Sequence, residues 1–229
     1  MIVGERKPFD EIKESIHGHK RVLILGCGTC VAVCMAGGEK EVELLGSQIR
    51  MASKMDDREI EIGEATIQRQ CDREYIEPIL EQARSYDVVL SMACGAGVQL
   101  VADMLEPMPV IPGLNTRFIG IAEGEGMWAE RCRACGNCVL GVYAGVCPIA
   151  RCPKSILNGP CGGSQGGKCE TDPNRDCAWA LICDRLSAQG KLDTICAVAP
   201  PKDFRTQDHP AKQVNEAYLK PEMEEAHSQ

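Results

Sequence analysis

Eight cysteines lie close together in one stretch of the chain, and their spacing indicates a metal centre. The first three, Cys132, Cys135 and Cys138, are separated by two residues each. Gaps of two residues let a tight turn present adjacent thiolates to one compact centre. The other five are Cys147, Cys152, Cys161, Cys169 and Cys177. Eight thiolates are enough ligands for two all-cysteine centres.

The identity of the metal follows from the first triple. C-x2-C-x2-C opens the pattern with which bacterial ferredoxins bind iron–sulfur clusters, and a Cys-Pro pair completes that pattern. Here Cys147 and Cys152 each precede a proline, but eight residues separate Cys138 from Cys147, whereas the ferredoxin pattern has three at this place. The fourth ligand therefore stays open, as does the division into quartets. Two four-cysteine zinc sites are the alternative, because zinc ribbons also use C-x2-C pairs.

A second group of cysteines lies in the first half of the chain. Cys27, Cys30 and Cys34 fall within eight residues, directly after an apolar run. This density exceeds ordinary packing use, so we expect a second cluster that Cys71 or Cys94 completes. Buried, inert cysteines are the alternative, since cysteine is a common small core residue. Cys183 and Cys196, the last two in the chain, are expected to be packing residues.

The residues around the main cysteine group suggest how a cluster would be stabilised. Residues 131–169 contain five basic residues and no Asp or Glu: Arg131, Arg133, Arg151, Lys154 and Lys168. A cluster with four thiolates is anionic, and nearby cations stabilise it. We therefore expect Arg131 and Lys154 in its surroundings, with Trp179 packed over it to exclude water. The formal net charge of −8 argues against nonspecific nucleic-acid binding.

Alternating strands and helices are expected to position the N-terminal cysteines. Apolar runs predict strands at 21–25 and 87–92, and an alternating pattern predicts a strand at 60–66. An amphipathic pattern predicts a helix at 39–55, and further helices are expected at 72–85, after an acidic N-cap, and at 98–105. Strand-like pieces at 109–112 and 117–122 complete the series. This alternation is typical of a parallel α/β sheet, whose functional loops lie at the carboxyl ends of the strands. Cys27, Cys30 and Cys94 each follow a strand, so they can share that edge.

The chain divides into three parts by composition. Residues 1–125 are predicted to form a Rossmann-like α/β domain with a cluster at its strand ends. Residues 126–199 form a small cysteine-rich domain that folds around its metal, with a helix at 176–186. Residues 200–229 are polar and read as a tail, disordered or wrapped on a partner.

The location of the protein bears on its cysteine chemistry. The N-terminus lacks a basic start followed by an apolar run, and no apolar stretch has the length of a membrane span. We therefore expect a cytoplasmic protein. Disulfides are rare in a reducing compartment, so 15 cysteines indicate metal or redox chemistry.

The cysteine motifs resemble those of a known family. The string CRACGNCVLGVYAGVCPIARCPKSILNGPCGGSQGGKCE, at residues 132–170, resembles the cysteine-rich C-terminal domain associated with methylenetetrahydrofolate reductases. GCGTCVAVCMAGGEKEV, ATIQRQC, VLSMACGAGVQ and GLNT in the first half extend the likeness. Together the motifs are similar to the small iron–sulfur subunit of the two-subunit methylenetetrahydrofolate reductase of acetogens and related anaerobes.

The resemblance implies a division of labour within a heterodimer or larger complex. A separate TIM-barrel subunit would hold a flavin, expected to be FMN, and the folate. The present chain would carry [4Fe–4S] clusters and exchange electrons with that flavin, and would contribute no catalytic side chain. Two clusters are expected and the thirteen candidate ligands allow three. A ferredoxin or another redox subunit is a candidate electron donor.

Two other functions compete with this interpretation. A zinc-stabilised scaffold would hold the catalytic barrel without moving electrons. An independent oxidoreductase of the corrinoid-pathway or heterodisulfide type would use the N-terminal domain and would work without a flavin partner.

Overall fold

The computed structural model describes residues 1–207 and 210–218, which form two compact units. The first unit is Met1–Arg133 and the second begins at Ala134. Residues 208–209 and 219–229, which belong to the expected tail, lie outside the described residues.

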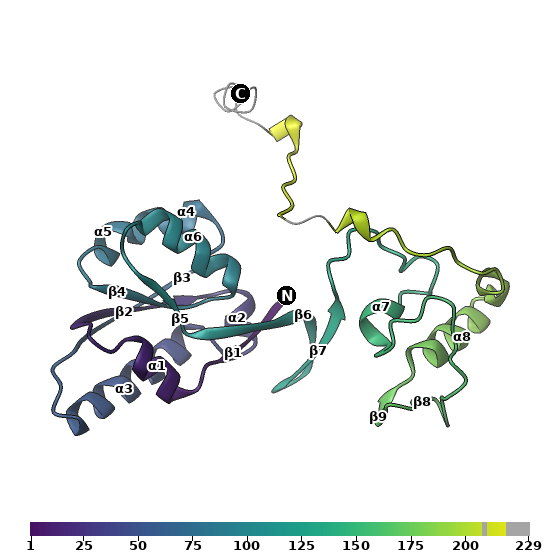
Figure 1. The fold of residues 1–229 in the computed structure, drawn as a ribbon, viewed down its shortest axis with the longest axis horizontal. Coiled ribbons are helices and arrows are strands. Elements are labelled where there is room, and N and C mark those ends of the chain that lie inside the picture. Colours follow the sequence, from purple (N-terminus) through teal and green to yellow (C-terminus); the bar gives the residue numbers. More distant parts are fainter. Residues whose placement is uncertain (208–209, 219–229) are drawn as a thin grey trace. The chain divides into compact units, whose positions relative to one another are not determined.

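A four-stranded parallel sheet forms the centre of the first unit (Figure 1). Its strands lie in the order β3-β2-β4-β5, and every neighbouring pair is parallel. Their bounds are β2 Arg21–Cys27, β3 Glu61–Ile67, β4 Val88–Met92 and β5 Val110–Pro112. The sequence patterns therefore predicted these strands correctly, and the α/β fold with a parallel sheet is confirmed.

Helices cover both faces of this sheet (Figure 1). On β2, Val22 and Ile24 pack in the cluster that contains helices α1 and α3, whereas Leu23 and Leu25 pack with α4, α5 and α6. Successive strand residues point to opposite faces, so the unbroken apolar run reflects burial on both sides. The helices are α1 Phe9–Ser15, α2 Cys30–Val33, α3 Glu39–Met55, α4 Arg73–Ile76, α5 Leu80–Ala83 and α6 Gly95–Leu105.

The single helix expected at 72–85 is wrong in its continuity. Asp72 is the N-cap, and its side chain accepts a hydrogen bond from the Glu74 amide at 3.4 Å. However, a 3₁₀ turn at Glu77–Ile79 separates α4 from α5. Pro78 lies in that turn and has no amide hydrogen, so the regular hydrogen-bond ladder cannot pass through it.

A second, antiparallel sheet contains strands that the apolar pattern placed differently or did not predict. Its order is β1-β6-β7, with bounds β1 Ile2–Arg6, β6 Leu114–Gly124 and β7 Met127–Cys132. Residues 117–122 were expected to continue the α/β series, but they pair with β1 and β7 instead. Val3 of β1 and Leu114 of β6 belong to the apolar cluster under α3, so this sheet packs against the same core as the parallel sheet.

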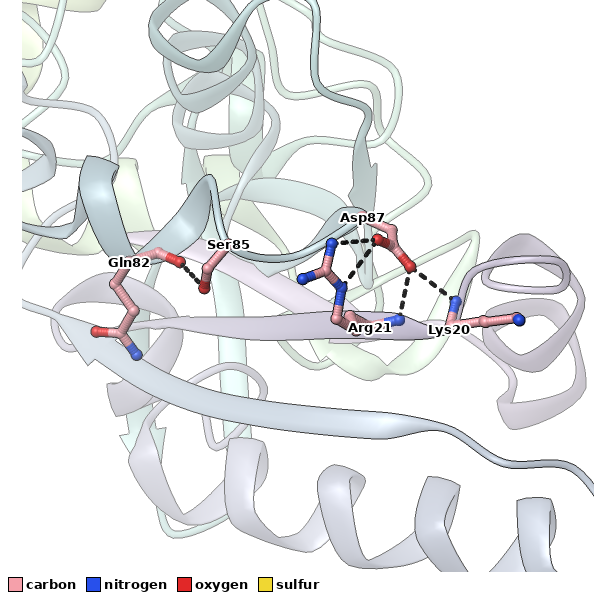
Figure 2. A network of polar contacts seen from close by, with 5 residues as sticks. All are labelled: Lys20, Arg21, Gln82, Ser85 and Asp87. Carbon is pink, nitrogen blue, oxygen red and sulfur yellow. Dashed lines mark hydrogen bonds and ion pairs between the residues drawn. The ribbon is translucent and has the colours of Figure 1, made fainter.

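A carboxylate joins the amino ends of β2 and β4 (Figure 2). Asp87 accepts hydrogen bonds from the backbone amides of Lys20 and Arg21, at 3.0 and 2.8 Å, and from the Arg21 guanidinium. The Arg21 amide, helped by its guanidinium, holds the pKa of Asp87 below its ordinary value. This network sets the register of the two central strands at the edge opposite the cysteines.

The second unit has little regular structure. It contains α7 Pro148–Arg151, the two-stranded sheet β8 Lys168–Cys169 and β9 Asp172–Asp176, and α8 Ala178–Ala188. The 3₁₀ turns are Leu192–Ile195, Phe204–Thr206 and Glu216–Tyr218. One small cluster forms its core: Tyr143, Val146, Cys177, Ala178, Trp179, Ile182 and Leu186. The helix predicted at 176–186 is thus present as α8.

Part of the expected tail lies on this same unit. The Thr206 hydroxyl donates a hydrogen bond to the Cys135 carbonyl oxygen at 3.2 Å. Asn158 exchanges two hydrogen bonds with the backbone of Ala199, at 2.9 and 2.7 Å. Residues 199–206 are therefore tied to the cysteine-rich loops. None of the helices in the described ranges is both long and apolar enough to cross a membrane.

Candidate metal centres

Three N-terminal cysteines come to the carboxyl edge of the parallel sheet. Cys27 is the last residue of β2, and Cys94 follows the end of β4 as the N-cap of α6. Cys71 lies in the loop after β3. Because β3, β2 and β4 are neighbours in that order, these three loops meet at one edge.

A buried amide ties the Cys71 loop to the two central strands. Gln70 is 0% exposed, donates to the Leu25 carbonyl oxygen at 2.8 Å and accepts from the Ser91 hydroxyl at 2.6 Å. Leu25 is in β2 and Ser91 is in β4, so one side chain bridges both strands. Gly97 of α6 permits this approach, because a Cβ there would lie 2.8 Å from Gln70 Cβ.

The thiols at this edge are close enough to influence one another. Cys71 is exposed as a residue, yet the burial of its thiol raises its pKa, and the thiols of Cys94 and Cys27 raise it further. Cys27 Sγ also lies 4.0 Å from the Gln68 carbonyl oxygen in the Cys71 loop. The structure thus places the thiols of Cys27 and Cys94 close enough to Cys71 to raise its pKa.

Cys34 has different surroundings from the other cysteines of its motif. It is 4% exposed, and its Sγ accepts a hydrogen bond from the Gly4 amide at 3.4 Å. The same sulfur lies 3.5 Å from the Val31 carbonyl oxygen and 3.7 Å from that of Gly4. Burial raises the pKa of this thiol. Cys34 is therefore packed against β1, in the core cluster under α3.

Replacing Gln70 with Leu should destabilise the first unit by about 1–3 kcal/mol, because the Leu25 carbonyl and Ser91 hydroxyl would be buried without partners. Urea unfolding monitored by circular dichroism measures this change. Gln68→Leu is the matched control, since Gln68 is exposed and only its backbone carbonyl makes a contact in the structure. Equal stability of the two variants would show that Gln70 does not hold the edge together.

Four cysteines of the second unit line one apolar cavity. They are Cys152, Cys161, Cys169 and Cys177. Trp179 also lines this cavity, as do Lys154 and Glu170, which form an ion pair with each other. The hydroxyl of Thr171, 3.3 Å from Cys169 Sγ, lowers the pKa of that thiol and so favours the thiolate that metals bind.

Trp179 is fixed on the wall of this cavity. Its Nε1 donates to the Ile156 carbonyl oxygen at 2.8 Å, and its ring meets Tyr143 edge to face with 5.5 Å between centroids. The indole is 3% exposed. Gly159 lies flat against it, because a Cβ at this position would be 2.5 Å from Trp179 Nε1. The ring therefore forms a fixed part of the cavity wall.

The other four cysteines of the run lie outside the cavity lining. Cys132 ends β7, whereas Cys135 and Cys138 follow the start of the second unit. Cys147 is the N-cap of α7, and its Sγ accepts from the Ala150 amide at 3.4 Å. Cys183 lies partly buried on α8, and Cys196 is exposed.

In the described part of the chain, no three Cys, His, Asp or Glu side chains are grouped so that they could hold one metal ion. The thiols at the sheet edge and around the cavity are neighbours that do not converge on a point. All their donors are cysteine sulfurs, the ligands that iron–sulfur clusters and structural zinc prefer. The donor chemistry of both sites thus fits a thiolate-bound metal group.

The sequence suggested a block of basic residues without acidic partners, but most of these residues form ion pairs in the structure. Carboxylates that flank the segment neutralise four of the five. The ion pairs are Arg131–Glu123, Arg133–Glu130, Lys154–Glu170 and Lys168–Asp176. Lys154 still lies at the cavity, whereas Arg131 is in β7 and is not among the cavity residues. A count of charges along the sequence misses partners that lie just outside the counted window.

The comparisons with known proteins concern the second half of the chain. Residues 111–205 match the model of a family described as methylene-tetrahydrofolate reductase C terminal. No curated protein and no solved structure matches the chain. The matched residues contain β6, β7 and all eight cysteines of the run. This match agrees with the family that the cysteine motifs of this stretch resemble.

Proposed function

We propose that the chain is an electron-transfer subunit that carries [4Fe–4S] clusters in a methylenetetrahydrofolate reductase complex. The observation that supports this most is the cavity lined by Cys152, Cys161, Cys169 and Cys177, within the segment that matches the reductase family. Four thiols around an apolar space provide the ligands and the dry surroundings of an iron–sulfur cluster.

Four thiols could hold a cluster or a single zinc ion, and the two differ in where the sulfurs lie. A tetrahedral zinc ion needs four sulfurs at about 2.3 Å from one point. In a cubane cluster each iron takes one thiolate at a separate corner. The apolar lining of the cavity would give such a cluster dry surroundings. Cys135, Cys138 and Cys147 of the second unit remain as candidate ligands of a further cluster.

The role of the chain in the reaction would be to supply electrons. The partner, a TIM-barrel subunit with bound FMN, would transfer a hydride to the folate substrate and so lose an electron pair. One-electron carriers in the present chain would restore that pair one electron at a time, with a ferredoxin or another redox subunit as the source. Trp179 and the Lys154–Glu170 pair would shape the dielectric around the cluster.

Metal analysis of the anaerobically purified complex tests this proposal. We expect about four irons and four acid-labile sulfides per cluster, with visible absorbance that dithionite bleaches. Cys161→Ala should remove one cluster and slow reduction of the partner flavin, whereas Cys196→Ala should change neither, since Cys196 is exposed and outside the cavity. Zinc with four sulfurs per ion and no labile sulfide would instead establish the scaffold function.

A further inference from the structure

The carboxyl edge of the parallel sheet has the position of a ligand site. The chain runs from β2 to β3 on one side and then crosses to β4 on the other, so neighbouring loops leave β2 and β4 in opposite directions. In open α/β sheets, ligands bind at such a switch point, beyond the carboxyl ends of the strands. Here Cys27 ends β2 and Cys94 follows β4, so a thiol lies at the carboxyl end of each strand that borders the switch point.

The third thiol, that of Cys71, is held at this edge of the sheet by hydrogen bonds of its loop. Gln70 fastens the loop after β3 to both strands that border the switch point, through Leu25 and Ser91. The Gly28 amide donates to the Ile67 carbonyl oxygen at 2.9 Å, which joins the loops after β2 and β3. Cys71, the neighbour of Gln70, therefore cannot leave the edge without breaking buried hydrogen bonds.

Either Cys30 or Cys34 could be the fourth ligand, and the two differ in the burial and the contacts of their sulfurs. Cys30 begins α2, three residues after Cys27, and is partly exposed. Cys34, at the end of the same helix, is almost fully buried and has its sulfur occupied by the backbone of Gly4 and Val31. If Cys34 were a metal ligand, its sulfur would have to give up these contacts and its side chain would have to leave the core under α3.

We propose that Cys27, Cys30, Cys71 and Cys94 hold an iron–sulfur cluster of their own, and that Cys34 is not a ligand. This inference rests on the proposed iron–sulfur chemistry but uses residues that the family match does not cover. The four residues come from three loops of one sheet, whereas the motif C-x2-C-x3-C taken alone would select Cys34.

Three alanine variants of the full chain, purified anaerobically with its partner, test the ligand set. Cys71→Ala and Cys94→Ala should each lose about four irons per chain and the same electron paramagnetic resonance signal. Cys34→Ala should keep both. Circular dichroism should show that all three variants are folded. If Cys34→Ala does not fold, Cys34→Ser, which retains a group able to bond to Gly4, replaces it.

The outcomes separate this inference from the proposed function. Iron in the wild type that is unchanged in Cys71→Ala or in Cys94→Ala overturns the ligand set alone. Loss of the signal in a folded Cys34→Ala variant does the same, and so does zinc at this edge. A wild-type complex with no iron removes the proposed function and this inference together. Loss restricted to the Cys71 and Cys94 variants supports the four-cysteine centre.

Discussion

Removal of iron from the proposed clusters should unfold the cysteine-rich unit and leave the parallel-sheet unit folded. The described part of the second unit has one small apolar cluster and two short helices, so its own burial contributes little. Metal binding contributes on the order of 10 kcal/mol to the folding of small metallo-domains. The first unit has apolar clusters on both faces of its sheet and does not need a metal to bury them.

Hydrogen exchange read by mass spectrometry measures this difference region by region. After anaerobic treatment with ferricyanide and a chelator, amides of α8 and of residues 134–177 should lose protection. Amides of β2 and β4 should stay protected, which provides an internal control. Equal protection of α8 with and without iron would mean that the second unit folds without its metal.

Trp179→Ala should be the most damaging single substitution outside the cysteines. It removes a buried indole, its bond to the Ile156 carbonyl and its contact with Tyr143. Truncation of a buried Trp costs about 3–5 kcal/mol, which is large for a unit with so small a core. It also opens one wall of the four-cysteine cavity to water. We expect loss of iron and rapid proteolysis of the second unit.

Two further variants assign the cause. Trp179→Phe keeps an aromatic ring but loses the bond to Ile156, so it should be intermediate. Tyr218→Ala removes an aromatic side chain that is 84% exposed and should have no effect. Iron content and cluster absorbance are measured beside stability. A Trp179→Ala protein with unchanged stability and cluster would show that the indole neither supports the unit nor shields the cavity.

The sequence predicted the parallel sheet most clearly at β2 and β4, because these strands are buried on both faces and are mostly apolar. It did not predict β1 or β7, because polar and apolar residues are mixed in both strands. The helix at 72–85 was predicted from its acidic N-cap, a signal that does not register the effect of Pro78 on hydrogen bonding. The hydrophobic pattern of the sequence thus locates buried strands and helices better than exposed ones.

The candidate sites show a similar limit. Strand ends placed Cys27 and Cys94 at a common edge, as the sequence indicated. The nearness of Cys71 depends on Gln70, a polar residue whose two partners are 45 and 21 positions away. A buried polar residue beside a cysteine is a weak signal that no spacing rule uses. The inward packing of Cys34 depends on β1, which the pattern missed.

The parallel order of the sheet has a consequence for how the protein matures. The thiols of Cys27, Cys71 and Cys94 meet only after β2, β3 and β4 have paired, so this edge cannot receive a cofactor before the sheet has formed. The cysteine-rich unit has the reverse requirement, since it would need its metal in order to fold. Cluster delivery would therefore be a late step for one half of the polypeptide and an early one for the other. A cell short of iron would accumulate chains that are half folded, with an intact sheet and an unprotected C-terminal half.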